Sequence, residues 1–300
     1  MKSKFIVLFI ISTLFVNHIC CAENYKVVKL NKDDRVLVLA PHPDDEVIGA
    51  GGIIQQAVSL KIPVKVVYLT NGDNNELAFF MYKKRPVLSQ KELIKMGEIR
   101  QKESIEAMRE LGLDEKYLIF LGYPDFGTLN IFTQHWGESP PFKSMLTKVK
   151  EVPYANSFSK GSSYVGENVL NDLKEILLHF KPTKVFVTHP ADFNVDHRAF
   201  YLFLRIALWD LRDKFLEPEI YPFLVHAYQF PTPRGLRQEL ELQPPKSLKK
   251  SSIVWHSFSL KESQISKKKN AIDRFKTQLT YSRKYLYSFV RKSEIFGDFP

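Results

Sequence analysis

Short apolar runs alternate with segments of helical periodicity along most of the chain. The runs have the length and composition of strands buried on both faces of a parallel sheet, and they cover residues 35–40, 64–69, 117–121 and 184–188. The apolar spacing between and after them predicts helices over residues 53–58, 89–111, 169–180 and 196–215. Two later strands, residues 220–230 and 252–260, and a last helix over residues 262–290 complete the pattern.

This alternation predicts an α/β fold with three layers, a Rossmann-like α/β/α arrangement around a mostly parallel sheet. The chain has 300 residues, of which 44% are hydrophobic and 25% charged, as is typical of a soluble globular protein. We therefore expect one large domain over residues 23–300. A stretch without periodicity, at about residues 122–166, is rich in proline and aromatic residues and is interpreted as a lid or binding wall, with disorder of its middle as the alternative.

The first 22 residues have the layout of a secretory signal. Lys2 and Lys4 precede the apolar run 5–16, and small residues lead to Ala22. A run of about 12 residues is shorter than the ~20 that cross a bilayer. We therefore expect cleavage after Ala22, no stable transmembrane segment afterwards, and a periplasmic or secreted protein. An uncleaved membrane anchor and a lipid-modified cysteine are the alternatives.

The cysteines and the net charge limit the kinds of metal ligand and of binding partner that we expect. Cys20 and Cys21 are the 2 cysteines of the chain and both lie in the expected signal, so a metal in the exported protein would bind histidine and carboxylate side chains. The net charge of +10 owes much to lysines in residues 246–250 and 267–269. These lysines predict either attraction to acidic glycans or anionic lipids or, more simply, a solvated lysine-rich face. No nucleic-acid module accompanies them, so no nucleic-acid partner is expected.

A first polar cluster, Pro-His-Pro-Asp-Asp-Glu at residues 41–46, directly follows the first strand. Its crowded acids would repel one another unless a cation lay between them. A divalent metal bound by His42 and Asp45 relieves this repulsion and leaves Asp44 as a base for a water molecule. The alternative is that Asp44 or Asp45 caps the next helix while His42 only packs.

A second cluster, residues 189–198, follows another buried strand, so an open parallel sheet can bring it opposite the first. His197 would then complete a His-Asp-His set with an open position for water, which is typical of a catalytic zinc site. We expect one Zn²⁺ per chain, although this ligand type leaves iron and manganese open. Asp196 is a candidate for orienting a ligand from behind.

These clusters resemble motifs of the PIG-L/LmbE family of N-acetylglucosaminyl deacetylases. The family's A-H-P-D-D-E corresponds to residues 40–46, its T-N-G-D to residues 70–73, and its H-P-x-D-x-H-x-D-H region to residues 189–197. Weaker matches are residues 100–103, the turn 121–125, and a late helix with Lys269, Ala271 and Gln278, so the resemblance spans roughly residues 35–296. By position it implies that His42, Asp45 and His197 bind the metal and that Asp44 is the general base.

The chain departs from the family at Asn194, where most members have a histidine that stabilises the oxyanion or protonates the leaving amine. Asn194 can still donate a hydrogen bond to an oxyanion, but its amide has no proton to transfer near neutral pH. Asp44 is therefore the favoured source of the amine's proton, with His189 and Asp192 as alternatives. Arg100 and Asp125 are candidates for substrate contacts.

The resemblance implies a zinc-dependent hydrolase that deacetylates an N-acetylglucosamine-type amino sugar or glycoconjugate and releases acetate and a free amine. Two hypotheses from other classes compete with it. The first is a metal-containing glycan-binding protein that lost turnover through the change at Asn194. The second is a metal-dependent phosphoesterase, which is weakened because two-metal sites usually need more carboxylates than this ligand set provides.

Overall fold

Five parallel strands form the central sheet of the molecule. The computed structural model describes residues 25–74, 89–248 and 251–298. The strands of this sheet, in the order in which they lie side by side, are β4 (Leu118–Tyr123), β3 (Val64–Thr70), β2 (Val36–Ala40), β5 (Lys184–Thr188) and β6 (Glu219–Phe223). All four pairs of neighbours are parallel. The four apolar runs of the first half of the pattern therefore are buried parallel strands, as predicted.

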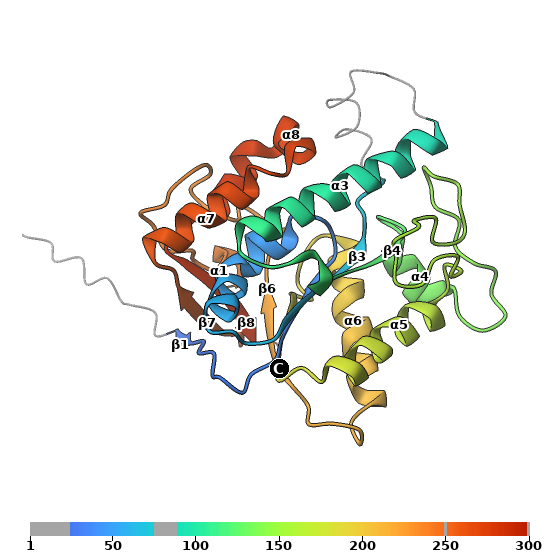
Figure 1. Ribbon diagram of the computed structural model, residues 1–300, viewed down its shortest axis with the longest axis horizontal. Helices are drawn as coiled ribbons and strands as arrows, with labels where there is room; N and C mark the ends of the chain where they lie inside the picture. Colours follow the sequence, from blue (N-terminus) through green and yellow to red (C-terminus); the bar gives the residue numbers. More distant parts are fainter. Residues whose placement is uncertain (1–24, 75–88, 249–250, 299–300) are drawn as a thin grey trace, which may run out of the picture.

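Helices cover both faces of this sheet, because the side chains of each strand alternate between two hydrophobic cores. Val36 and Val38 of β2 face one core, whereas Leu37 and Leu39 face the other. The first core includes α1 (Asp45–Ser59), α3 (Gln90–Glu110), α7 (Glu262–Ile272) and α8 (Lys276–Leu286). The second includes α4 (Thr128–Gln134), α5 (Gly166–Phe180) and α6 (Val195–Asp210). Figure 1 shows the two helical layers on either side of the strands, which confirms the predicted three-layer, Rossmann-like α/β/α fold.

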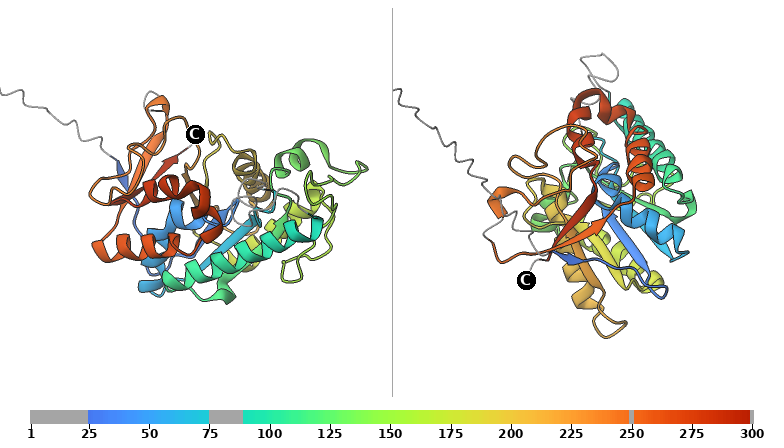
Figure 2. Two further views of the ribbon diagram at one scale, coloured as in Figure 1. Left: turned by 90° about the horizontal axis from the view of Figure 1, so that it is seen from above. Right: turned by 90° about the vertical axis from the view of Figure 1, so that its left-hand side faces the viewer.

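A small second sheet extends the molecule beside β6. It is ordered β1 (Lys26–Val27), β7 (Val254–Ser259) and β8 (Ser293–Asp298), with β7 antiparallel to β8. The ring of Phe296 on β8 packs edge-on against Phe186 of β5, with 5.0 Å between the ring centroids, so the two sheets share a core. Figure 2 shows these strands next to the C-terminal helices. The sequence pattern predicted β7 but missed β1 and β8.

Several predicted helix boundaries differ from the structure, and α6 ends at Asp210 rather than at residue 215. α1 begins at Asp45 rather than at residue 53, but non-helical backbone angles at Ala50 (φ −139°, ψ 20°) divide it, so the predicted helix corresponds to its second part. Asp45 and Glu46 lie in the first turn, where acidic side chains interact favourably with the helix dipole. The predicted single helix over residues 262–290 is two helices, because Phe275 between them has a non-helical ψ of 64°. This break lets α8 run over the carboxyl ends of the central strands.

The long segment that follows β4 is part of the ordered fold. It contains α4 and a bridge between Glu151 and Ser163. Two of its tyrosines, Tyr154 and Tyr164, are buried, and the Tyr154 hydroxyl donates to Asp73 Oδ2 over 2.5 Å. The alternative of a disordered middle is therefore wrong, and the segment packs as a wall beside the strand ends.

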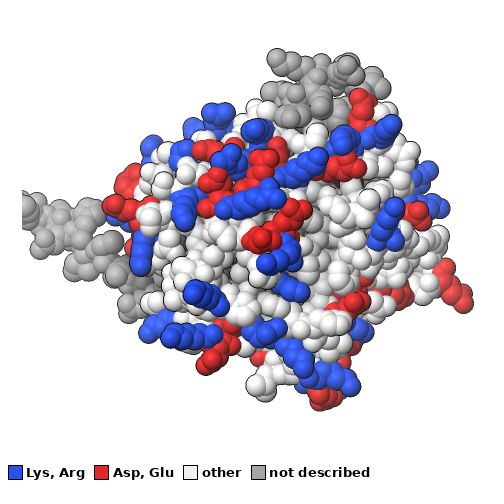
Figure 3. Space-filling model, viewed as in Figure 1, with Lys and Arg blue, Asp and Glu red and all other residues white. Residues whose placement is uncertain are grey.

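The lysine-rich segment of α7 is only partly a solvated face. Lys268 is buried, and its Nζ donates to Glu294 Oε1 over 2.6 Å and to the Ile48 carbonyl over 2.9 Å. Glu294 in turn accepts from the backbone amide of Gly52 over 2.7 Å, so this ion pair fastens α7 to α1. The interpretation of residues 267–269 as solvated lysines is corrected for Lys268. On the face seen in Figure 3, basic and acidic side chains intermingle.

The predicted signal, with Cys20 and Cys21, lies outside the described residues. Within the part of the chain that the structure covers, none of the helices combines the length and the apolar character that a membrane span requires. The domain boundary at residue 23 stays a prediction.

Candidate active site

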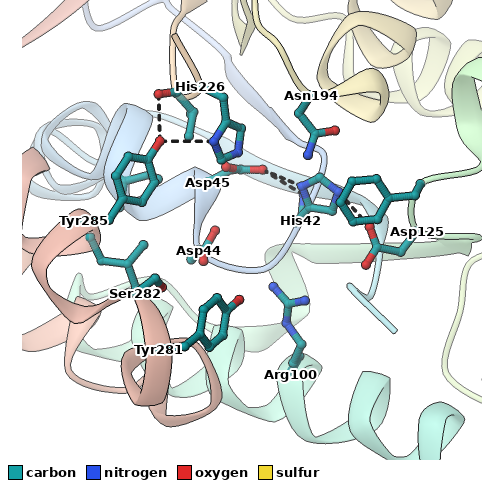
Figure 4. A pocket seen from close by; sticks show the side chains of 14 residues that line it. His42, Asp44, Asp45, Arg100, Asp125, Asn194, His226, Tyr281, Ser282 and Tyr285 are labelled. Carbon is teal, nitrogen blue, oxygen red and sulfur yellow. Dashed lines mark hydrogen bonds and ion pairs between the residues drawn. The ribbon is translucent and has the colours of Figure 1, made fainter. Parts of the chain in front are cut away.

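The candidate site lies at the carboxyl ends of β2 and β5, which are neighbours in the sheet. β2 pairs with β3 on one side and with β5 on the other, so the order of the strands reverses here. Such a switch point leaves a crevice between loops that leave the sheet in opposite directions. A cavity of about 200 Å³ occupies this position and is lined by residues from the loops after β2, β4, β5 and β6 and from α1, α3 and α8. Figure 4 shows these side chains converging on it.

Three ligand atoms from the two sequence clusters meet at the base of this cavity. Asp45 Oδ2 lies 3.2 Å from His42 Nδ1 and 3.1 Å from His197 Nε2, and the two imidazole nitrogens are 3.2 Å apart. Tetrahedral zinc with bonds of about 2.0–2.1 Å holds its ligand atoms roughly 3.3–3.4 Å from one another. The donor set and its spacing therefore fit a zinc ion with His42, Asp45 and His197 as ligands.

The charge around these atoms also favours a cation. His42, Asp45 and His197 are all buried. Burial opposes their ionisation, yet the Asp125 carboxylate raises the pKa of His42, and Asp192 and Asp45 together raise the pKa of His197 to about 9. Carboxylates thus outweigh the fixed positive charge, and a bound cation would balance them.

Asp125 and Asp196 hold His42 from behind. His42 Nε2 lies 3.1 Å from Asp125 Oδ1 and 3.1 Å from Asp196 Oδ2, so its Nε2–H donates to Asp196 beside the Asp125 carboxylate, and its Nδ1 lies next to Asp45. Asp196 also accepts from the backbone amides of Phe126 over 2.6 Å and Thr128 over 3.1 Å. These contacts fix the tautomer and the orientation of His42, the usual task of a carboxylate behind a metal-binding histidine.

Asp192 performs the same task for His197 and joins the surrounding loops. Its Oδ2 lies 3.2 Å from His197 Nδ1 and accepts from the backbone amides of Val225 over 2.9 Å and His226 over 2.8 Å. Its Oδ1 accepts from the Asn194 amide over 2.9 Å. Asp192 therefore supports the site and, with its oxygens so engaged, has no role as a proton donor to substrate.

Asp44 points into the cavity from a strained backbone position. It precedes α1 with a φ of 113°, and its carboxylate makes no capping hydrogen bond to the described residues of the helix. A non-glycine residue in this region costs of order 1–3 kcal/mol, and such strain often occurs at functional sites. Burial and the neighbouring Asp45 raise the pKa of Asp44 to about 8. The interpretation of Asp44 as a simple helix cap is therefore wrong.

Asn194 caps α6 with its side-chain oxygen and lines the cavity with its side-chain nitrogen. As the N-cap residue of α6, it uses its Oδ1 to accept from the Asp196 amide over 2.8 Å. Its Nδ2 is therefore the end that remains for the cavity, and Figure 4 shows this nitrogen on the side of His42. Asn194 accordingly offers the site a hydrogen-bond donor.

Arg100 braces the loop that carries His42 and Asp44. Its Nη1 donates to the Gly72 carbonyl over 2.7 Å and its Nη2 to the Pro43 carbonyl over 3.1 Å, while Gln278 Nε2 donates to the same Pro43 carbonyl over 3.0 Å. Gly72 has a φ of 64°, and a Cβ there would lie 1.7 Å from Arg100 Nη1. The strand-end motif at residues 70–73 therefore needs its glycine to let Arg100 reach the loop, and Arg100 both supports the loop and lines the cavity.

The structure does not bring His189 into the cavity. Its ring stacks on Trp255, with 6.1 Å between centroids, and its Nδ1 accepts from the Ala191 amide over 3.0 Å. Burial lowers the pKa of His189 to about 4. His189 is therefore a packing residue behind the site, and the hypothesis that it protonates the leaving amine is corrected.

His226 and Tyr285 are among the cavity residues that the sequence analysis missed. His226 follows β6, and its ring lies 4.9 Å from that of His197. Burial and the nearby His197 lower the pKa of His226 to about 4, so its ring is neutral. Tyr285 of α8 stacks on His226, with 5.8 Å between centroids. The sequence analysis missed His226 because it placed this residue inside a predicted strand over residues 220–230. β6 ends at Phe223, so His226 lies just after the carboxyl end of a strand, as the two polar clusters do.

The fold and the site define a Rossmann-like protein with a buried His-Asp-His cluster at its switch point. A family model described as GlcNAc-PI de-N-acetylase matches residues 37–208, and the chain belongs to this PIG-L family. Among proteins with curated descriptions, none matches the chain in sequence.

Solved structures show the same fold at low identity. A conserved protein of Thermus thermophilus is 20% identical, with a TM-score of 0.53 over 88% of this chain and 94% of that one. An N,N'-diacetylchitobiose deacetylase from Pyrococcus horikoshii is also 20% identical, with a TM-score of 0.52 over 88% and 84%. The A40926 pseudoaglycone deacetylase is 15% identical, with a TM-score of 0.52 over 88% and 96%.

Proposed function

We propose that the chain is a zinc-dependent hydrolase that removes the acetyl group from an N-acetylglucosamine-type amino sugar or glycoconjugate. The observation that carries this proposal is the meeting of His42 Nδ1, Asp45 Oδ2 and His197 Nε2 within 3.2 Å of one another at the base of a cavity that Asp44 also lines. Membership of a de-N-acetylase family supports the reaction class. The cavity of about 200 Å³ is smaller than the ~300–1,000 Å³ of typical ligand sites and suits one acetylated sugar unit.

The residues of the cavity divide the work of amide hydrolysis. Zinc bound in such a site supplies Lewis acidity towards a carbonyl and lowers the pKa of water. Asp44 accepts the proton of the water whose oxygen bonds to the acetyl carbon, and Asn194 Nδ2 donates to the oxyanion that forms there. Asp44 then returns this proton to nitrogen as the C–N bond breaks, which gives acetate and a free amine. One carboxylate thus serves as base and then as acid, since Asn194 has no proton to transfer.

Acetate release from N-acetylated sugars tests this proposal. Zinc-loaded protein is expected to release acetate and amine in equal amounts from N-acetylglucosamine, diacetylchitobiose or an N-acetylglucosaminyl lipid. Metal analysis of the protein as purified, before any metal is added, should give one zinc per chain. Iron or manganese at the same stoichiometry would change the metal but not the mechanism. Sugar binding without acetate would favour the glycan-binding alternative. Phosphate release from model esters, with no acetate from acetylated sugars, would favour the phosphoesterase.

We also propose that the protein is exported. The basic start, the apolar run 5–16 and the small residues before Glu23 support cleavage after Ala22. Expression of the full chain should give a periplasmic or secreted protein whose sequence begins at Glu23. A mature protein that still begins at Met1 in the membrane fraction would support the uncleaved anchor instead, and one that begins at a lipid-modified Cys20 or Cys21 would support the lipoprotein.

A further inference from the structure

His226 is held by a chain of hydrogen bonds that the proposed mechanism has not used. The hydroxyl of Tyr285 donates to the Val225 carbonyl over 2.8 Å and lies 3.2 Å from His226 Nδ1. Both rings line the cavity, and they stack with an angle of 12° between their planes. Figure 4 shows Tyr285 on one side of His226 and the carboxylate of Asp45 on the other.

These contacts decide which nitrogen of His226 carries the proton. Tyr285 has a single hydroxyl proton, and the Val225 carbonyl can only accept, so this proton points at the carbonyl. The tyrosine oxygen is then an acceptor towards His226 Nδ1, which must carry the proton of the neutral ring. His226 Nε2 is therefore left as a hydrogen-bond acceptor at the edge of the ring away from Tyr285.

Backbone hydrogen bonds connect the loop that carries the donor Asn194 to the loop that carries the acceptor His226. The backbone amide of Phe193, next to Asn194, donates to the His226 carbonyl over 2.9 Å. Asp192 accepts from the backbone amides of both Asn194 and His226, over 2.9 Å and 2.8 Å. The loops after β5 and β6 thus hold one side-chain donor and one side-chain acceptor at fixed positions around the same cavity.

A secondary acetamide carries the complementary pair, a carbonyl acceptor and an N–H donor. We infer that Asn194 Nδ2 and His226 Nε2 together recognise the acetamide, with Asn194 on the carbonyl oxygen and His226 on the N–H; this assignment rests on the proposed deacetylase function. His226 is then the residue that selects N-acetyl over O-acetyl groups, and Tyr285 is a positioning residue that fixes its tautomer. An acetate ester has an oxygen in place of the N–H, so it would face His226 Nε2 with a second lone pair. A site built to bind an N–H discriminates strongly against an analogue without one.

The test compares two sugars that differ only in this group. The probes are 4-nitrophenyl glucosides with an acetamido or an O-acetyl substituent at carbon 2, and acetate release gives kcat/KM for each. His226→Phe keeps the stacked ring but removes the acceptor, and Tyr285→Phe frees the tautomer. We expect the amide-to-ester ratio of kcat/KM to fall by about tenfold or more in His226→Phe, which loses a hydrogen bond that the ester never makes. The ratio should fall by a smaller factor in Tyr285→Phe, because His226 Nε2 then is an acceptor in only one of two accessible tautomers. Tyr287→Phe is the matched control, since its hydroxyl donates to Asp273 and its side chain does not line the cavity.

Each result separates this inference from the proposed function. A wild-type ratio that both variants retain, with zinc content and amide turnover measurable, would overturn the assignment of His226 and leave the deacetylase standing. A fall in both activities by the same factor would also overturn it, because it would indicate a general structural role. A wild-type protein that releases acetate from neither probe nor from other acetylated sugars would refute the function, and the assignment with it. If His226→Phe fails to fold, the hydroxyl deletion in Tyr285→Phe still decides.

Discussion

Replacing Asp44 with asparagine is expected to lower kcat for acetate release by about 10³-fold, in the middle of the roughly 10²–10⁴-fold range for the loss of one acid-base group. The change keeps the size and shape of the side chain, so the loop with its φ of 113° should persist. Asparagine, however, neither accepts the proton of the attacking water nor returns one to the nitrogen. Because both steps depend on this carboxylate, kcat should fall more than KM changes.

The metal content of this variant separates chemistry from structure. Asp44 is not one of the three proposed ligands, so Asp44→Asn should bind zinc with the wild-type stoichiometry in metal analysis. Asp33→Asn, a change at an exposed aspartate, serves as the matched control and should retain full turnover. Turnover of Asp44→Asn within a few-fold of wild type would remove Asp44 from the mechanism. Loss of zinc together with turnover would show instead that Asp44 is needed to bind the metal.

Replacing His197 with alanine is expected to abolish zinc binding, and with it turnover. His197 is fully buried, and the change would leave two ligands for an ion that needs at least three from the protein. The loss of affinity should exceed the roughly 10–100-fold typical when only an outer partner of a ligand is removed. Isothermal titration with Zn²⁺ measures this directly, without any substrate.

Thermal unfolding gives an independent measure of the same loss. A metal that binds the folded chain raises its unfolding temperature by mass action, so zinc should stabilise the wild-type protein. It should not stabilise His197→Ala. His179→Ala, at an exposed histidine of α5, is the control and should respond to zinc as the wild type does. An equal increase in unfolding temperature for His197→Ala would place the ion elsewhere.

The residues of the proposed metal cluster could be named from the sequence because they belong to short contiguous motifs at the ends of apolar strands. The strand ends are visible in the sequence, since β2 and β5 are buried on both faces and read as unbroken apolar runs. The carboxyl ends of neighbouring parallel strands lie at the same edge of a sheet. This rule predicted that His42 and His197 lie close together, although they are 155 positions apart in the chain. The three-layer fold followed from the same alternation.

The positions of His226 and Tyr285 could not be predicted, because they depend on where a strand and a helix end, and these ends leave no signal in the hydrophobic pattern. β6 ends at Phe223 although apolar residues continue after it, so His226 was assigned to a strand interior. α7 and α8 share one helical pattern, and the turn at Phe275 that separates them is a matter of tertiary packing, since this phenylalanine is fully buried. Tyr285 reaches the cavity only because of that turn. His189 shows the opposite error, as a motif residue whose ring packs on Trp255 outside the cavity.

The change at Asn194 is more informative with the structure than without it. Its carbonyl oxygen caps α6 through Asp196, so its position is fixed and its amide nitrogen is the part left for substrate. A histidine at this position could both donate and transfer a proton, whereas asparagine can only donate. Under the proposed mechanism, Asp44 alone therefore both accepts the proton of the water and returns it to the nitrogen.

The central claim is that one ion joins the two distant clusters, and anomalous diffraction from crystals of the zinc-loaded protein tests it most directly. The account predicts a single strong peak at the zinc absorption edge, about 2.0–2.2 Å from His42 Nδ1, Asp45 Oδ2 and His197 Nε2. A peak bound by other residues, or a zinc-loaded crystal in which His197 faces away from His42 and Asp45, would contradict it.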